Sequence, residues 1–480
     1  MVFPDAKMSD IDVRSFRYGS IIAATLDTIS AGALDATVGG TTMLWPVTAE
    51  RDDAGRLAIG GVGIPDLAER FGTPLYVYDE RTIRQQCRLY REAFGGIYPN
   101  NRVVYAGKAY LAPALIQIIK EEGLSLDVVS GGELYVAIQS GFPAERITFH
   151  GNNKTPDELR MALDAGVGEI VIDNFYEIEV LADLLAEHGG RVDALLRLNP
   201  GIDTHTHDYR KTGIVDSKFG LLIETGDAAS AVERITQVEG INLRGYHIHL
   251  GSQIFEIEPY VAAVEALFHF AGEMRDAFGV VPDQISPGGG LGIQYESTDP
   301  DASVMEFAEA VATATKKGAE SMGIDLPELV VEPGRSIIGP AGVAVYRVGS
   351  IKDIPGIRRY VCVDGGMADN IRPPLYDAVY EAAIANRSGG TETTVTIAGK
   401  YCESGDVLIR DARLLEPESG DLIAIPASGA YCLAMASNYN MALRPAVVMV
   451  HDGETMVMQR RERYEDLLAR DAMTGGVPAR

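Results

Sequence analysis

The 480-residue chain carries a formal net charge of −26 at pH 7, which disfavours nucleic acid as a partner because the phosphate backbone would repel it. Its length exceeds one ordinary hydrophobic core, so we expect two domains, although a barrel domain could occupy more than half of it. The apolar run near the start, residues 21–26, is too short to span a membrane, and we expect a cytoplasmic protein.

The two ends of the chain differ from its middle. Residues 1–41 show no steady hydrophobic period, and we leave them unassigned as an N-terminal extension. Short apolar runs separated by turns then predict a β domain in residues 42–81, and this pattern returns in residues 336–480. The predicted strands are residues 56–59, 74–78, 343–348, 360–363, 393–398, 421–425 and 446–450, with a short helix at 65–71.

Between residues 82 and 335, apolar runs alternate with amphipathic stretches of helical period, a pattern typical of βα units. The predicted strands are residues 102–106, 124–129, 147–150, 169–173, 192–198, 243–250, 284–287 and 328–332. The clearest helices are residues 112–122, 156–165, 176–188, 258–277 and 303–322. Eight such units favour an α/β fold of the (β/α)₈ TIM-barrel type, because an open doubly wound sheet normally has fewer strands.

Polar residues gather at the C-terminal ends of these strands, where a barrel places its active site. They are Lys108, Asp127, His150, Asp173, Arg197, His247, His249, the Gly288-Gly289-Gly290 run, Glu332 and Arg335. A glycine run lets the backbone approach a phosphate closely, and an amine at a strand end can form a Schiff base. Each signal is weak alone, since such lysines are often solvated and glycine runs are often flexible loops. Together they predict pyridoxal phosphate as the cofactor.

That cofactor requires a carboxylate at its pyridine nitrogen, and Glu332 is an acid at the end of the eighth strand. An ion pair between Glu332 and Arg335 is the alternative. His247 and His249 lie on one side of a strand, and with the His205-Thr206-His207 segment they are also compatible with a barrel metallohydrolase. We favour the cofactor enzyme, which can use one histidine as a flat plate against the ring, and predict no metal site.

Across residues 42–460 the chain resembles the fold type III pyridoxal-phosphate decarboxylases, and most closely the diaminopimelate decarboxylase family. The motifs that carry the resemblance are Tyr105-Ala106-Gly107-Lys108-Ala109, Asp127-Val128-Val129-Ser130-Gly131-Gly132-Glu133, His150-Gly151-Asn152-Asn153-Lys154, Lys218-Phe219-Gly220, His249-Leu250-Gly251-Ser252-Gln253, Gly288 to Gly292, Glu332-Pro333-Gly334-Arg335, Arg372-Pro373-Pro374-Leu375-Tyr376 and Cys402-Glu403-Ser404-Gly405-Asp406. The resemblance implies decarboxylation of meso-2,6-diaminopimelate to L-lysine, the last step of lysine biosynthesis.

The resemblance also implies a role for individual residues. Lys108 would hold the cofactor as a Schiff base, His249 would stack on its ring, Glu332 would pair with its pyridine nitrogen, and Gly289, Gly290, Ser252 and Tyr431 would surround its phosphate. Arg335, Arg372, Tyr376, Glu403 and Tyr431 would bind the substrate, and Cys402 would return a proton to the substrate carbon. Cys402 and Glu403 would come from the partner subunit, which implies a homodimer with shared active sites.

The residues themselves support part of this assignment. Cys402 lies in a polar turn, where a thiol can act as an acid, and the four scattered cysteines are predicted to be free. Arg335 and Arg372 suit bidentate capture of a carboxylate, which favours a dicarboxylic substrate over ornithine or lysine, although Arg372 alone could be a surface residue.

Three alternatives stay open at this point. A related decarboxylase of a basic D-amino acid or of carboxynorspermidine would keep the cofactor residues and change the contacts to the distal end of the substrate. A metal-dependent barrel hydrolase would be inhibited by chelators. A non-catalytic homologue is disfavoured by the presence of Lys108, Cys402 and Glu403.

Overall fold

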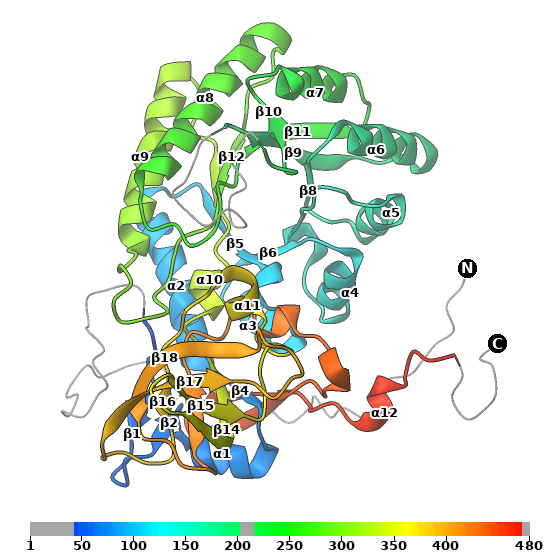
Figure 1. The fold of residues 1–480 in the computed structure, drawn as a ribbon. Coiled ribbons are helices and arrows are strands. Elements are labelled where there is room, and N and C mark those ends of the chain that lie inside the picture. Colours follow the sequence, from blue (N-terminus) through cyan, green and yellow to red (C-terminus); the bar gives the residue numbers. More distant parts are fainter. Residues whose placement is uncertain (1–42, 202–215, 473–480) are drawn as a thin grey trace.

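The structure is a computed structural model, and it describes residues 43–201 and 216–472. The predicted N-terminal extension and the His205-Thr206-His207 segment lie outside the described residues. Two bodies are visible in Figure 1, a ring of helices around parallel strands and a second sheet beside it.

The first body is a closed barrel of eight parallel strands. They are β5 (Asn101–Ala106), β6 (Ser125–Val128), β7 (Ile147–Phe149), β8 (Glu169–Ile172), β9 (Val192–Asn199), β11 (Ile241–His247), β12 (Gln284–Gly288) and β13 (Glu328–Val331). β13 pairs with β5 in parallel, Leu329 opposite Asn101, which closes the ring. A short strand, β10 (Leu221–Leu222), pairs in parallel with the C-terminal end of β9. The predicted TIM-type barrel is confirmed.

Helices cover the outside of the barrel (Figure 1). They are α2 (Glu80–Ile97), α3 (Pro113–Glu121), α4 (Gly131–Gln139), α5 (Pro156–Ala165), α6 (Phe175–His188), α7 (Asp227–Thr236), α8 (Glu258–Phe278) and α9 (Val304–Met322). Side-chain caps define several of their starts: Ser130 accepts from the Glu133 N–H, and Thr155 and Glu158 form a reciprocal capping box. These caps define where α4 begins after β6 and where α5 begins after β7.

The second body is a sheet built from both ends of the chain, as predicted. Its strands follow the order β18 (Val407–Leu415), β17 (Glu392–Ala398), β15 (Arg358–Val363), β14 (Gly342–Ile354), β4 (Leu75–Asp79), β20 (Ala446–His451) and β21 (Glu454–Gln459). β16 (Ala383–Ile384) and β19 (Leu422–Ile425) pair beside β14, while β1 (Glu50–Arg51), β2 (Leu57–Ile59) and β3 (Val62–Gly63) form a small separate sheet before α1 (Ile64–Phe71). β4 lies between β14 and β20, which ties the N-terminal segment to the C-terminal one. The exact domain boundaries stay a prediction.

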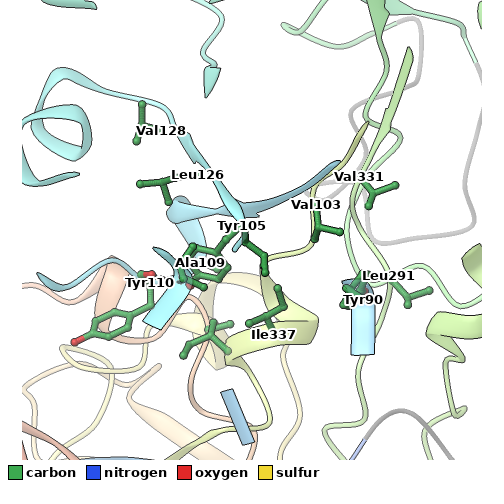
Figure 2. Close-up of a cluster of buried hydrophobic side chains, with 14 of the residues drawn as sticks. Tyr90, Val103, Tyr105, Ala109, Tyr110, Leu126, Val128, Leu291, Val331 and Ile337 are labelled. Carbon is green, nitrogen blue, oxygen red and sulfur yellow. Dashed lines mark hydrogen bonds between the residues drawn. The ribbon is translucent and has the colours of Figure 1, made fainter. Parts of the chain in front are cut away.

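A buried cluster behind β5 fixes the strand that leads to Lys108. Figure 2 shows Val103 and Tyr105 of β5 among Tyr90, Leu291 and Ile337, all of them at most 5% exposed. The Tyr105 hydroxyl donates to the backbone oxygen of Tyr110 at 2.7 Å, so the chain is held on both sides of the lysine. Burial of a large apolar side chain of this kind stabilises the fold by about 1.5–3 kcal/mol.

None of the helices in the described part of the chain has the length and apolar character that a membrane crossing requires.

Candidate active site

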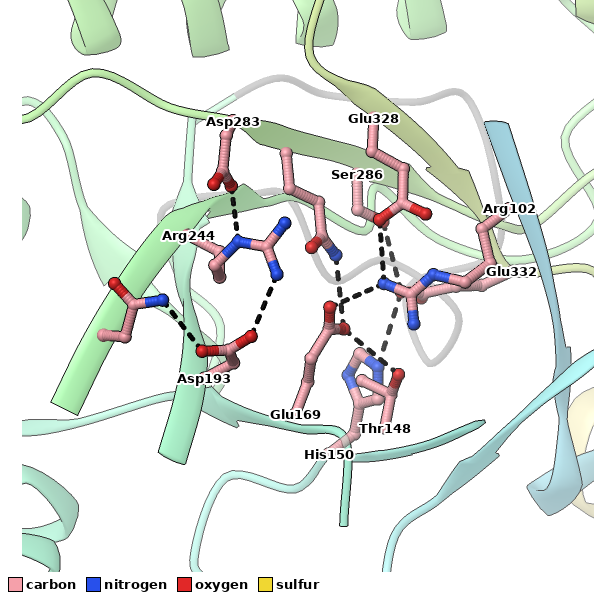
Figure 3. A network of polar contacts seen from close by, with 12 residues as sticks. Arg102, Thr148, His150, Glu169, Asp193, Arg244, Asp283, Ser286, Glu328 and Glu332 are labelled. Atoms are coloured by element: carbon pink, nitrogen blue, oxygen red, sulfur yellow. Dashed lines mark hydrogen bonds and ion pairs between the residues drawn. The ribbon is translucent and has the colours of Figure 1, made fainter. Parts of the chain in front are cut away.

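A cavity of about 320 Å³ opens at the C-terminal ends of the barrel strands, beside the second sheet. It is lined by Lys108, Phe219, His249, Ser252, Gly290, Glu332, Arg335, Arg372, Tyr376, Tyr431 and Met435, among others. A larger opening of about 940 Å³ lies at the opposite end of the barrel, lined by residues such as Arg102, Glu169 and Arg244. There the arginines are held by acids (Figure 3), and none of the predicted site residues is present, so we place the active site in the smaller cavity.

Lys108 lies in a single 3₁₀ turn, Gly107–Ala109, directly after β5. A side chain at Gly107 would bring its Cβ to 2.6 Å from the Asp127 backbone oxygen, so only glycine permits this tight approach to β6. From the second sheet, the Tyr431 N–H donates to the Ala109 oxygen at 2.8 Å. Lys108 therefore lies at the junction of the two bodies.

Glu332 is buried after β13 and contacts residues of β11 and β12 and the residue that follows β7 across the barrel. Its carboxylate lies 2.9 Å from His247 Nε2. It also accepts from the Ser286 hydroxyl at 3.1 Å and lies 3.4 Å from His150 Nε2 (Figure 3). Burial would raise the pKa of Glu332, but His247 and His150 outweigh burial and hold this pKa well below its ordinary value. The predicted carboxylate is therefore charged, as a partner of a protonated pyridine nitrogen should be.

The pKa values of the two histidines in contact with Glu332 are shifted in opposite directions. Burial lowers the pKa of His247 to about 4, despite the opposing effect of Glu332, whereas Asp127 and Glu332 raise the pKa of His150 against its burial. His150, His247 and Glu332 bring their ligand atoms within 4.8 Å of one another, which is also compatible with a metal ion. His249 is not part of this group, contrary to the pairing of His247 and His249 considered from the sequence.

His249 instead belongs with the glycine loop. β11 ends at His247, and Gly288, the last residue of β12, has a φ of 76°. The Gly289 N–H lies 3.3 Å from His249 Nδ1. Burial, followed by the nearby charges of Lys108 and Arg197, lowers the pKa of His249 well below its ordinary value, so its ring is neutral.

Two of the loop glycines are required by sterics. A Cβ on Gly289 would overlap the Glu332 backbone oxygen, and one on Gly290, whose φ is 112°, would overlap the Gly251 oxygen. The loop therefore packs its backbone against both neighbouring strand ends, which is how glycines let main-chain N–H groups face a phosphate.

Arg335 and Arg372 both reach the cavity and are 8% and 3% exposed, so the interpretation of Arg372 as a surface residue is wrong. Arg335 begins the short helix α10 (Arg335–Ile338), and Arg372 begins α11 (Arg372–Tyr376). Arg335 donates to the Ser252 hydroxyl at 2.9 Å and to the Tyr295 hydroxyl, and Arg372 donates to the Tyr380 hydroxyl. Within residues 43–201 and 216–472, neither guanidinium pairs with a carboxylate.

The considered ion pair between Glu332 and Arg335 is therefore wrong, since each has other partners. Burying a guanidinium without an acid is unfavourable unless a bound anion completes the site. Two such guanidinium groups in one cavity indicate a site for an anionic ligand. Ser252, predicted to contact the phosphate, lies beside Arg335, so the two predicted sub-sites adjoin.

Cys402 and Glu403 do not join this cavity within their own chain. Both are exposed in the turn after β17, where the Cys402 N–H donates to the Asn440 side chain at 2.9 Å. All four cysteines are free, as predicted. A single chain thus brings together the predicted cofactor residues and both arginines, but leaves the predicted proton donor outside.

Several residues at the site had no predicted role. Ser286 contacts Glu332, Phe219 lines the cavity, and Tyr295 and Tyr380 contact the arginines. Tyr295 follows the glycine run by five residues, and Phe219 lies in a motif that the resemblance contained, so both positions carried a signal. Tyr380 carried none, because it lies in a segment without periodic pattern.

The residues present fit pyridoxal phosphate. An amine, a charged buried carboxylate, a neutral buried imidazole and a glycine loop converge on one cavity. Three buried polar atoms in addition have no hydrogen-bond partner in the described chain: both Asp127 carboxylate oxygens and Arg335 Nε. Such atoms are expected where a polar ligand completes a site.

Comparison with known proteins agrees with this geometry. A family model described as "Pyridoxal-dependent decarboxylase, pyridoxal binding domain" matches residues 80–339. The diaminopimelate decarboxylase of Bacillus subtilis is 51% identical over 425 residues, which cover 88% of this chain and 97% of that protein. The chain belongs to the diaminopimelate decarboxylase family. The cofactor of this family is pyridoxal phosphate, so the metal-hydrolase alternative is set aside.

Solved structures place the chain in the same family. The crystal structure of diaminopimelate decarboxylase from M. jannaschii in complex with L-lysine matches with a TM-score of 0.84 at 35% identity, covering 89% of this chain and 98% of that one. A lysine/ornithine decarboxylase from Vibrio vulnificus, in complex with cadaverine, matches with a TM-score of 0.69 at 25% identity, covering 81% and 97%. The diaminopimelate decarboxylase family thus shares its fold with decarboxylases of simpler amino acids, and specificity has to be argued from the residues of the cavity.

Proposed function

We propose that this protein decarboxylates meso-2,6-diaminopimelate to L-lysine and carbon dioxide, with the residues of the described cavity as its active site. The observation that carries the proposal is the pair of buried arginines without an acidic partner, in the same cavity as Lys108 and Glu332. Its relatives named diaminopimelate decarboxylase support the same substrate.

The cofactor half of the cavity has a defined task for each side chain. When bound, pyridoxal phosphate supplies an electron sink for the electron pair left behind as carbon dioxide departs. Lys108 would hold the cofactor through Nζ. The Glu332 carboxylate keeps a proton on the pyridine nitrogen, and the neutral ring of His249 supports the flat face of the cofactor.

The phosphate end is held by the glycine loop. The backbone of Gly289 and Gly290 would lie against it, together with the Ser252 and Tyr431 side chains. Because these groups are fixed by backbone packing, they would hold the cofactor in one place relative to the strand ends. Which of the two carboxylates of the substrate departs would then depend on the end that Arg335 and Arg372 hold.

The other half of the cavity selects the substrate. Arg335 and Arg372 bind the distal carboxylate, and the half-buried Tyr376 closes the same side. A substrate without this carboxylate, such as D-lysine, would leave two buried cations unpaired, which discriminates more strongly than shape alone. The substrate selected is therefore a dicarboxylic diamino acid.

A substrate panel separates this proposal from the related decarboxylases. We expect kcat/KM for meso-diaminopimelate to exceed the values for D-lysine and carboxynorspermidine by about 10²-fold or more, because an unpaired buried charge is costly. Carbon dioxide release is the measurement, with pyridoxal phosphate added to every reaction. A preference for D-lysine or carboxynorspermidine would instead assign the protein to the decarboxylases of that substrate.

Replacement of Glu332 by glutamine tests the cofactor half. We expect kcat to fall by about 10²- to 10³-fold with the cofactor still bound, because a neutral amide does not hold the pyridine proton. Ser286→Ala is the matched control: it removes one hydrogen bond to the carboxylate but keeps its charge, so its kcat should fall far less. Steady-state kinetics decides the question, and a kcat for Glu332→Gln close to that of the wild type would contradict the role of Glu332.

We further infer a homodimer in which Cys402 and Glu403 complete the active site of the partner subunit. The support is their position, since both are exposed and neither lines the cavity of its own chain. In this arrangement Cys402 returns a proton to the substrate carbon, and Glu403 faces the distal ammonium group. The exposed Leu375 of α11 and Val379, three residues after that helix, offer apolar surface for such contact.

Mixing two inactive variants tests this arrangement. Lys108→Ala and Cys402→Ala should each be inactive, whereas a mixture after subunit exchange should recover about one quarter of wild-type activity. Half of the randomly formed dimers are then hybrids with one intact site out of two. No recovery, with both variants dimeric by light scattering and exchange shown by mass spectrometry, would place both residues in one chain.

A further inference from the structure

Tyr295 lies between the two arginines of the cavity. Its hydroxyl accepts a hydrogen bond from Arg335, and its ring centre lies 4.4 Å from the guanidinium carbon of Arg372. The ring also meets Tyr380 edge to face, with centres 5.2 Å apart and planes at 83°. One side chain thus touches both groups that are proposed to bind the distal carboxylate.

Tyr295 is itself firmly placed. It is 4% exposed, its N–H donates to the Asp299 carboxylate at 2.8 Å, and its backbone oxygen accepts from the Glu381 N–H at 3.2 Å. It is not among the residues that line the cavity. Any effect of Tyr295 on the substrate is therefore transmitted through the arginines.

The contacts of Tyr295 offset the repulsion between two buried guanidinium groups. Two guanidinium groups in one buried site repel each other, and this repulsion is strongest when no anion is bound. The negative face of an aromatic ring attracts Arg372, and the phenolic oxygen accepts a hydrogen bond from Arg335. Tyr295 thus stabilises both cations in place before the substrate arrives, which reduces the ordering that binding requires.

We propose that Tyr295 is a positioning residue that sets the arrangement of Arg335 and Arg372 and so determines the preference for a distal carboxylate. This inference rests on the proposed function of the cavity. Tyr295 makes its two contacts through different parts of the side chain, so they can be removed separately. Tyr295→Phe removes the acceptor for Arg335 only, whereas Tyr295→Leu also removes the ring beneath Arg372.

Steady-state kinetics on the holoenzyme tests this graded effect. We expect Tyr295→Phe to raise KM for meso-diaminopimelate by about tenfold, in line with loss of one hydrogen bond to a charged group, and to leave kcat within about twofold. Tyr295→Leu should raise KM by about 10²-fold. The kcat/KM for D-lysine, which has no distal carboxylate, should stay near the wild-type value in both variants.

Tyr246→Phe is the matched control. Tyr246 is fully buried, its hydroxyl has no hydrogen-bond partner in the described chain, and its ring packs on Phe270 of α8. This substitution should change neither KM nor the ratio between the two substrates. A similar loss for meso-diaminopimelate and D-lysine in the Tyr295 variants would show a general structural role and overturn the proposal.

A binding measurement keeps the inference separate from the proposed reaction. Pimelate is a dicarboxylate without amino groups, so its binding to the holoenzyme by calorimetry requires the arginines but no turnover. Binding should weaken about tenfold in Tyr295→Phe and further in Tyr295→Leu. Unchanged pimelate binding in both variants would overturn the role of Tyr295, whereas failure of the wild type to release carbon dioxide from meso-diaminopimelate would overturn the proposed function.

Discussion

Replacement of Lys108 by alanine should reduce kcat by about 10⁴-fold, comparable to the loss of one member of a catalytic group in other enzymes. The amine of Lys108 is placed at the end of β5 by a tight turn and by the buried cluster beneath it, and it is the lysine that lines the cavity. The visible absorption band of the lysine-bound cofactor should disappear as well, because the amine that forms the Schiff base is removed.

Lys352→Ala provides the control for this substitution, because Lys352 is an exposed residue of β14 in the second sheet. It should retain both the band and the activity of the wild type. Ultraviolet-visible spectra and single-turnover assays on both variants give the answer. A band that persists in Lys108→Ala, together with more than about a tenth of the activity, would show that another lysine holds the cofactor.

Replacement of Arg372 by alanine should lower kcat/KM for meso-diaminopimelate by about 10²- to 10³-fold, since the distal carboxylate would lose one of its two buried partners. The cofactor band should remain, because Arg372 belongs to the arginine half of the cavity. Turnover of D-lysine should be little affected. The variant should therefore prefer meso-diaminopimelate over D-lysine only weakly, where the wild type prefers it strongly.

The conservative variant sharpens this test. Arg372→Lys keeps the charge but loses the planar fork of donors and the contact with the Tyr295 ring, so it should recover only part of the loss. Thermal unfolding of both variants measures how much stability is lost when a smaller side chain leaves space beside Tyr380. Equal losses for meso-diaminopimelate and D-lysine would contradict a role of Arg372 in recognising the distal carboxylate.

The fold was largely predictable because the barrel strands are apolar runs that end at polar residues. Some helices and strands were not predicted, because their local sequence pattern is not typical of the structure they form. α4 starts at Gly131-Gly132, which resembles a loop, although the Ser130 cap and Glu133 define a helix start. β18 contains Arg410, Asp411 and Arg413, which interrupt the apolar pattern of a strand that is paired along its length with β17.

The site was predictable where position along a strand decides it, as for Glu332. It was not predictable where residues of different strands meet, because the contact of His247 and His150 with Glu332 depends on the register of the closed barrel. The arrangement around Tyr295 depends on loop structure, which has no period in the sequence. The place of Cys402 depends on a second subunit, and it stays a prediction.

The most direct test of the central claim is the joint measurement of carbon dioxide and L-lysine formed from meso-diaminopimelate by the purified protein with pyridoxal phosphate. We predict equal molar amounts of the two products, and neither product from the Lys108→Ala variant. A wild-type protein that binds the cofactor and forms neither product, or releases carbon dioxide without L-lysine, would contradict the account.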